Sequence, residues 1–133
     1  MAITVTRDRG AKMKHVVQVR AHQVFADTAV DEGGEDLGLD PHDFYDSALG
    51  SCKALTVLWY ANRKGIPVED IQVSVERDRT GEKAGTYRLR TELKVTGDLT
   101  DAQRRELLSV AQKCPLHKLM TQLTTEIETV LAE

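Results

Sequence analysis

The fold of this chain is decided by residues 40–67, which read DPHDFYDSALGSCKALTVLWYANRKGIP. Asp40 is a good helix N-cap, Pro41 suits the first helical position, and the carboxylate of Asp43 in the first turn suits the helix dipole. Gly65 and Pro67 are typical of a helix end. The stretch therefore predicts one long helix from Pro41 to about Lys64.

Apolar residues recur along this helix at intervals of three and four, which is the spacing of one helical face. They are Tyr45, Ala48, Leu49, Cys52, Leu55 and Trp59. We therefore expect this stripe to face the core, with Cys52 within it.

On the N-terminal side of the helix, two β-branched segments at Ile3–Val5 and Val16–Phe25 flank a turn-like stretch at residues 9–12. Their alternation predicts an antiparallel hairpin or meander. Residues 31–38 are polar and rich in glycine, so we expect a connecting loop.

On the C-terminal side, alternating residues at Ile71–Val75 and Tyr87–Val95 flank a charged turn at Thr80–Gly85. This pattern predicts a second antiparallel hairpin. Thr100 and Gln103 have the spacing of a capping box, which predicts a helix that runs to about Lys113.

The end of the chain predicts two further elements. Cys114 followed by Pro115 indicates the N-cap and first residue of a short helix that continues through Met120. The residues Glu126–Leu131 suggest a final strand.

The composition fits one globular domain over residues 1–133, since 41% of the residues are hydrophobic and 29% are charged. No apolar run approaches the roughly 20 residues of a membrane span. The first residues lack the apolar core of a secretory signal, so we expect a cytoplasmic protein that does not bind membranes. A formal net charge of -3 argues against nucleic-acid binding.

The chain has two cysteines, and in a reducing compartment they are expected to be thiols. Cys114 has the setting of a reactive thiol, because unpaired N–H groups at a helix start and the neighbours Lys113, His117 and Lys118 favour a thiolate. An ordinary buried cap residue is the alternative reading. Cys52, on an apolar stripe beside Lys53, has the setting of a core residue.

Three segments carry a family resemblance: residues 40–52, residues 59–71 (WYANRKGIPVEDI) and residues 114–117 (CPLH). They are similar to the OsmC/Ohr family, which comprises osmotically inducible protein C and the organic hydroperoxide resistance proteins. The order of the predicted elements follows the family over nearly the whole chain.

The resemblance implies an α+β fold in an intertwined homodimer, with antiparallel sheets wrapped around long central helices. It also implies a thiol-dependent reductase of organic hydroperoxides. Cys52 would be the peroxidatic cysteine, and Cys114 would be the resolving cysteine that closes a disulfide. An external dithiol would reduce that disulfide, and neither a cofactor nor a metal would take part.

The chain departs from the family beside the reactive cysteine. The peroxidases have a glutamate ten residues before it, where this chain has His42, and Asp43 is one residue away. The family also uses an arginine, and Arg7, Arg9, Lys14 and Arg20 on the early strands offer no basis for a choice. Helix-start roles for His42 and Asp43 are the simpler reading.

Other function classes remain open. The same fold could be a small-molecule or lipid-binding protein with little peroxidase activity, in which both cysteines are core residues. Cys114 and His117 have a spacing found in metal sites, with His15, His22 and His42 as further ligands, although no second ordered pair accompanies them. A cysteine hydrolase would need an orienting group beside His117 and Cys114, and none is evident.

Overall fold

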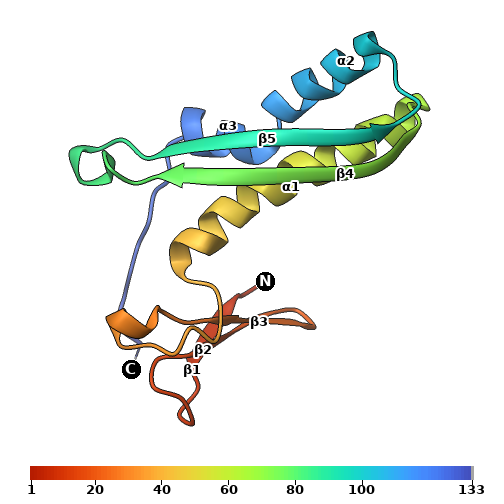
Figure 1. The fold of residues 1–133 in the computed structure, drawn as a ribbon. Coiled ribbons are helices and arrows are strands. Elements are labelled where there is room, and N and C mark those ends of the chain that lie inside the picture. The colour runs from red at the N-terminus through yellow and green to blue at the C-terminus, as the bar shows by residue number, and fades with distance from the viewer. Residues whose placement is uncertain (133) are drawn as a thin grey trace. The chain divides into compact units, whose positions relative to one another are not determined.

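The computed structural model describes residues 1–132, which form a mixed α and β structure with two antiparallel sheets (Figure 1). This confirms the predicted α+β class. Contacts divide the chain into two compact units, residues 1–47 and the part from Ala48 onward, and the boundary falls inside the long helix α1, Pro41–Lys64. A single domain over residues 1–133 stays a prediction. Within residues 1–132, no helix combines the length and the hydrophobicity that crossing a membrane requires.

The first unit contains the predicted meander, with strands β1 (Thr4–Arg7), β2 (His15–Val19) and β3 (His22–Ala26) in antiparallel order β1-β2-β3. Between β2 and β3 the chain turns at Arg20, which has a left-handed φ of 52°. The sequence predicted one unbroken run from Val16 to Phe25. This turn was missed because no glycine, asparagine or aspartate marks it.

The connecting loop contains a short 3-10 helix, η1 (Val30–Glu32), and leads into α1. Asp40 and Asp43 cap the start of α1 reciprocally, since each carboxylate accepts the backbone N–H of the other residue, at 2.9 and 3.1 Å. At the other end Gly65 has a φ of 68°, and the N–H of Ile66 reaches back to the carbonyl of Ala61 at 2.9 Å. Both predicted ends of the helix are confirmed.

The buried face of α1 differs from the predicted stripe. Tyr45, Leu55 and Trp59 are 46%, 68% and 59% exposed, so their predicted burial is wrong, and Cys52 is half-buried. The buried positions recur instead at intervals of three and four around a neighbouring row: Asp46, Leu49, Gly50, Lys53, Val57 and Ala61. At Gly50 in this row the helix comes close to Val75. Tyr45, Leu55 and Trp59 of the predicted stripe stay exposed.

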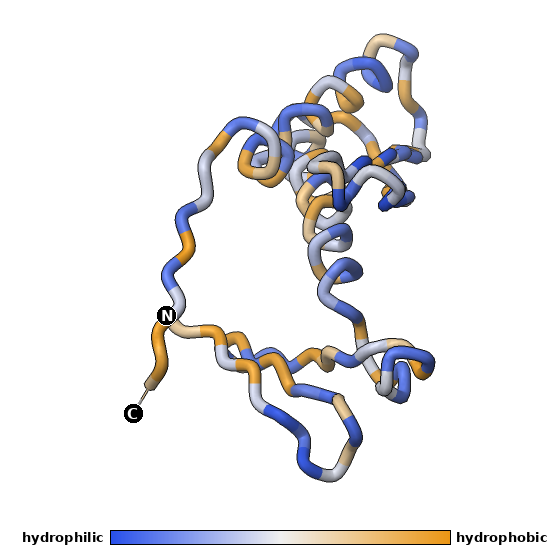
Figure 2. The backbone as a smooth tube through the Cα atoms, turned by 90° about the vertical axis from the view of Figure 1, so that its left-hand side faces the viewer, coloured by the Kyte–Doolittle hydropathy of each residue, from blue (hydrophilic) through white to orange (hydrophobic). Residues whose placement is uncertain are grey.

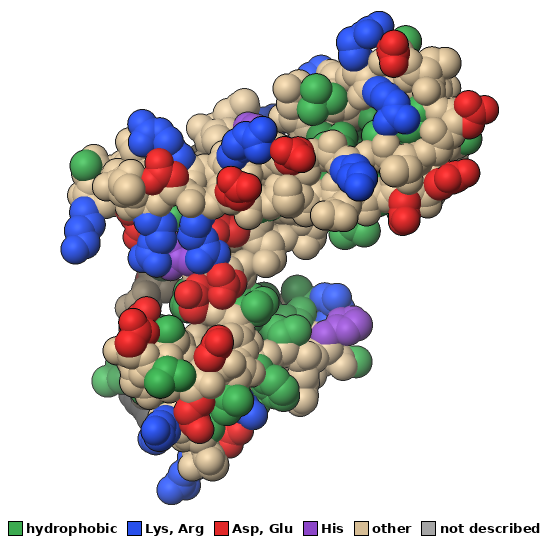
Figure 3. Space-filling view, viewed as in Figure 1, with side chains coloured by type: hydrophobic (Ala, Val, Ile, Leu, Met, Phe, Trp, Pro, Cys, Tyr) green, Lys and Arg blue, Asp and Glu red, His purple; other side chains and the backbone are tan. Residues whose placement is uncertain are grey.

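The second unit contains the predicted hairpin, formed by β4 (Val68–Asp78) and β5 (Arg88–Gly97) around the 3-10 helix η2 (Glu82–Ala84). Residues along both strands alternate between an apolar, partly buried face and a polar, exposed one; Val73 pairs with Leu93 on the apolar face. Figure 3 shows basic and acidic side chains intermixed on the exposed face. This alternation is the reason that the sequence revealed the hairpin.

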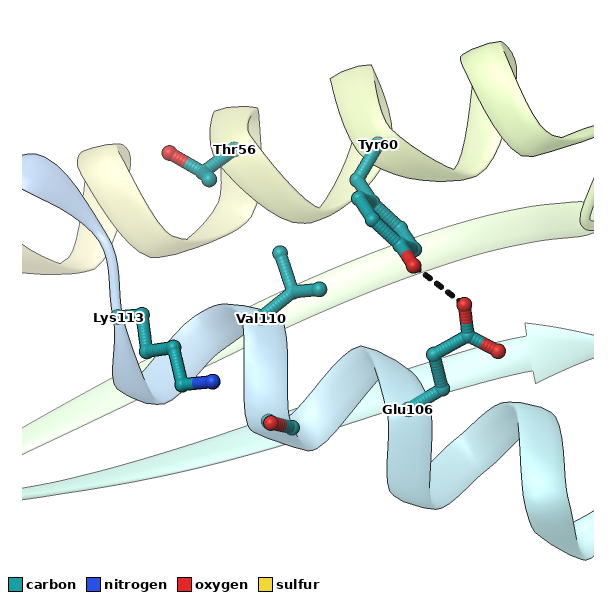
Figure 4. Close-up of a pocket in the computed structure, with 6 residues that line it drawn as sticks. Thr56, Tyr60, Glu106, Val110 and Lys113 are labelled. Carbon is teal, nitrogen blue, oxygen red and sulfur yellow. Dashed lines mark hydrogen bonds between the residues drawn. The ribbon is translucent and has the colours of Figure 1, made fainter.

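Helix α2 (Asp101–Gln112) begins at the predicted capping box, because Thr100 and Gln103 exchange side-chain and backbone hydrogen bonds. Helix α3 (Pro115–Gln122) follows it closely. Helices α1 and α2 lie on the same face of the β4–β5 hairpin (Figures 1 and 4). The buried core of this unit is formed by Val57, Ala61, Ile66, Val95, Leu107 and Ala111.

The predicted final strand at Glu126–Leu131 is wrong, since residues 124–132 have no regular secondary structure. A strand needs a neighbour to accept and donate its backbone hydrogen bonds, and the described part of this single chain does not provide one there. The segment keeps the apolar and polar mixture that suggested a strand, as Figure 2 shows along the C-terminal stretch.

Candidate active site

The sulfur of Cys52 lies at the start of helix α3. The backbone N–H of Leu116, the second residue of α3, donates to Cys52 Sγ at 3.4 Å. On its own helix, one turn further, Thr56 Oγ1 lies 3.9 Å from the same sulfur. The Cys52 side chain is half-buried. Its sulfur accepts a backbone hydrogen bond from a second helix, α3, in addition to its contact with Thr56 on its own helix.

Cys114 is the N-cap of α3, and Pro115 is the first helical residue, as the sequence predicted. The Cys114 side chain is fully buried and makes no capping hydrogen bond. Both cysteines are free thiols. Because Leu116 comes two residues after Cys114, the contact at Cys52 brings the Cys114-bearing turn against α1.

The helix N-terminus acts on a different cysteine from the one the sequence indicated. Unpaired N–H groups at a helix start stabilise negative charge, and we expected Cys114 to receive this effect. In the structure the N–H of Leu116 points to Cys52 instead. The sequence missed this contact because it joins residues 64 positions apart.

A buried lysine lies directly after Cys52. Lys53 is only 4% exposed, and its Nζ donates to the carbonyl oxygen of Ala111 at 2.8 Å. The same ammonium lies 3.0 Å from Nδ1 of His117. The sequence analysis considered Lys53 as a neighbour of Cys52, and His117 as a neighbour, a metal ligand or a hydrolase histidine beside Cys114, but it did not pair the two residues. The signal that could have paired them is the position of Lys53 on the buried row of α1.

A groove of about 430 Å³ runs between α1 and α2 (Figure 4). Most of its exposed lining surface is apolar, and the lining residues are Thr56, Tyr60, Glu106, Ser109, Val110 and Lys113. Thr56 belongs both to the groove and to the surroundings of the Cys52 sulfur. Cys52 itself does not line the groove, so Thr56 is the residue that connects the groove with the thiol.

Tyr60 and Glu106 point toward each other across the groove, and the Tyr60 hydroxyl donates to the Glu106 carboxylate (Figure 4). This hydrogen bond, followed by burial, raises the pKa of Tyr60 above its usual value of 10.0. The phenol therefore stays a neutral donor, and it ties α1 to α2 at one end of the groove.

The residues considered as replacements for the family's glutamate and arginine belong to the first compact unit. Asp43 caps α1 together with Asp40, which confirms its helix-start role. Lys14 forms an ion pair with Asp8 at 3.1 Å and lies over the ring of Phe25. No role toward Cys52 is assigned to any of these residues.

The structure does not support the alternative metal site. Among residues 1–132, no three His, Cys, Asp or Glu side chains come together as a group that could hold a metal ion. Nδ1 of His117 lies within hydrogen-bond distance of the Lys53 ammonium, so this ring nitrogen already has a partner. The hydrolase alternative gains no support either, because this partner of His117 is not a carboxylate.

A comparison with protein families matches residues 33–130 to the model of the family described as OsmC-like protein. This match covers both cysteines and every helix of the second unit. No curated protein sequence matches the chain.

Several solved structures have the same fold. An OsmC like protein from Mycoplasma pneumoniae has a TM-score of 0.73 at 19% identity, over 92% of this chain and 87% of that one. The organic hydroperoxide resistance protein OsmC of Legionella pneumophila has a TM-score of 0.65 at 17% identity, over 92% and 90%. The organic hydroperoxide resistance protein OhrB of Bacillus subtilis has a TM-score of 0.59 at 20% identity, over 92% of both chains.

Proposed function

The chain belongs to the OsmC-like protein family, and we propose that it is a thiol-dependent reductase of organic hydroperoxides. The observation that carries the proposal is the hydrogen bond from the N–H of Leu116 to the sulfur of Cys52. It supports first attack by Cys52, as the family resemblance implies. The names of the relatives from Legionella pneumophila and Bacillus subtilis agree with this substrate class.

In the first step the thiolate of Cys52 attacks the outer oxygen of the hydroperoxide. The O–O bond breaks, the sulfur becomes a sulfenic acid, and the alkoxide takes up a proton and leaves as an alcohol. The sulfur is oxidised by two electrons while the peroxide is reduced by two. The half-buried Cys52 is open to a small substrate, whereas the fully buried Cys114 is not.

In the second step the sulfur of Cys114 attacks the sulfur of the Cys52 sulfenic acid. An S–S bond forms and the S–O bond breaks, and the departing hydroxide takes the Cys114 proton to give water. An external dithiol then reduces the disulfide. We infer that it attacks at Cys52, which is the more exposed sulfur.

The groove between α1 and α2 is the proposed place for the organic part of the substrate. It adjoins the Cys52 sulfur at Thr56 and has polar groups along its length. A hydroperoxide whose organic group is largely apolar and carries one polar substituent fits this lining. The proposed compartment is the cytoplasm, where a reducing environment returns both cysteines to thiols between turnovers.

Thiol counting tests this function. One equivalent of an organic hydroperoxide should remove both free thiols of each chain, and a dithiol such as dihydrolipoic acid should restore them. The control is the Cys52→Ser variant, whose remaining thiol should survive the same dose. An unchanged thiol titre in the native protein would refute the function.

A second candidate is a small-molecule binding protein on the same fold, which the groove and the presence of His42 in place of the family's glutamate favour. In that case an organic ligand would bind without consuming either thiol. Cys52→Ser would then leave its affinity unchanged. Native thiols that resist both peroxide and alkylation would support this candidate.

A further inference from the structure

Lys53 is a buried charge that the proposed reaction does not use. Removing an ammonium from water is unfavourable unless its hydrogens find acceptors, and this side chain is 4% exposed. Two acceptors are present: the carbonyl oxygen of Ala111 at 2.8 Å and Nδ1 of His117 at 3.0 Å. Lys53 is therefore fixed in place by the segment that contains Cys114.

These two acceptors lie on opposite sides of the resolving cysteine. Ala111 is in the last turn of α2, where the helix dipole favours a cation, and its carbonyl also accepts the backbone N–H of Cys114 at 3.5 Å. His117 is in the first turn of α3. Lys53 thus bridges the two helices that flank Cys114.

Cys52 and Lys53 make complementary contacts to the same junction. The sulfur of Cys52 accepts an N–H at the start of α3, while the ammonium of Lys53 donates to a carbonyl at the end of α2. Two consecutive residues of α1 therefore hold both ends of the break in which Cys114 lies.

The chemistry of the Lys53–His117 contact indicates the direction of its hydrogen bond. A lysine ammonium has only donors, so Nδ1 of His117 is the acceptor. An amide oxygen at the position of Nδ1 could accept the same hydrogen, whereas an aliphatic side chain could not.

We propose that Lys53 and His117 are a positioning pair that holds the Cys114-bearing junction against Cys52 for disulfide closure. The proposal rests on the proposed function for its second step. Neither residue exchanges an atom or an electron in that step, in which the sulfenic oxygen leaves as water. Their effect is to keep the two sulfurs at a high effective concentration.

The test follows the two steps separately after mixing with an organic hydroperoxide. Mass spectrometry of quenched samples gives the rate of sulfenic acid formation and the rate of disulfide closure. Lys53→Met fills the buried site without a charge and should slow closure about tenfold or more, because a hydrogen-bonded charge is lost. Sulfenic acid should consequently accumulate. An exposed lysine on β5, away from both cysteines in the sequence, supplies the matched control, and Lys94→Met should close at the native rate.

A second pair of variants separates positioning from folding. His117→Asn retains an acceptor for Lys53 and should close faster than His117→Leu, which removes it. Melting temperatures of all variants are measured in parallel. Equal closure rates in native protein and Lys53→Met, or in the Asn and Leu variants, would overturn the proposal.

Diamide, a thiol oxidant that needs no peroxidase site, separates a failure of the proposed function from a failure of the positioning pair. If native protein closes the disulfide with diamide but not with hydroperoxide, the proposed function fails. The positioning pair is then still tested by the slower diamide-driven closure of Lys53→Met. If diamide does not join Cys52 to Cys114 in the native protein, the positioning pair is refuted as well.

Discussion

Asp27 organises the loop that precedes α1. Its side chain is buried, and its carboxylate accepts the backbone N–H groups of Thr28, Glu35 and Leu37 at 2.7, 3.2 and 3.0 Å. These hydrogen bonds, the one from Leu37 most of all, lower the pKa of Asp27 below its usual 3.8, although burial opposes them. The charged form is therefore the one that holds the loop.

This arrangement predicts a pH dependence of stability. The folded pKa of Asp27 is depressed, so its contribution to the free energy of unfolding is fully present above the unfolded pKa of 3.8. It is lost as the pH falls below that value. Asp27→Asn should therefore be less stable than native protein at pH 7, and the difference should shrink below pH 3.8. Urea unfolding across this range measures it, and a difference that is the same at every pH would contradict the assignment.

At this scale the sequence predicted local features better than long-range contacts. The N-cap position of Cys114 followed from the proline after it, which is local information. The catalytic roles of Cys52 and Cys114 stay predictions. The contacts of Cys52 with Leu116 and of Lys53 with His117 join α1 to α3. Such long-range contacts depend on how helices pack, which residue spacing along one helix does not specify.

Helix α1 approaches strand β4 closely at Gly50. A Cβ atom added there would lie 3.0 Å from Cγ2 of Val75, which is tighter than ordinary van der Waals contact. Glycine is unfavourable inside a helix by about 1 kcal/mol relative to alanine. Its presence on the buried row therefore fits a packing requirement between the two elements.

Alanine at this position tests the packing. In a Val75→Ala background, Gly50→Ala should stabilise the protein by about 1 kcal/mol through helix propensity. In the native background the gain should be smaller, or reversed, because Cγ2 of Val75 must move. Denaturant unfolding of the four proteins gives the coupling, expected to be about 0.5 kcal/mol or more. Equal effects in both backgrounds would show that the approach is not close.

Elements with local signals were predicted well. The caps of α1 and α2 and the alternation in β4 and β5 are all written in short stretches of sequence. The exposure of Leu55 and Trp59 and the lack of a strand at residues 126–131 were not foreseen. The burial of an apolar helix face and the formation of a strand both depend on a neighbouring element. The sequence pattern reveals the apolar face or the strand-like segment, but not the element that would pack against it.

At the scale of the whole molecule, the second unit exposes more large apolar side chains than scattered surface residues explain. They lie on α1, on α3 and along the C-terminal segment: Leu55, Leu58, Trp59, Leu119, Leu123, Ile127, Val130 and Leu131. We propose that a second copy of the chain covers them, as the family resemblance implies for an intertwined homodimer. A second copy would also offer the C-terminal segment a strand partner.

Light scattering measures this assembly. The native protein should have a mass of about twice the 14.8 kDa of one chain. Trp59→Glu places a charge on the exposed apolar face and should shift the protein toward the monomer mass. Gln72→Glu adds the same charge on the polar face of β4 and should leave the mass unchanged. A native protein of single-chain mass would contradict the homodimer.

The most direct test of the reaction identifies the sulfur that the peroxide oxidises first. Each single Cys→Ser variant is treated with one equivalent of an organic hydroperoxide in the presence of a reagent that traps sulfenic acid, and the labelled residue is located by mass spectrometry. Because the start of α3 donates its N–H to Cys52, Cys114→Ser should carry the label on Cys52 and Cys52→Ser should stay unlabelled. A label on Cys114 in Cys52→Ser, with none on Cys52 in Cys114→Ser, would contradict first attack by Cys52.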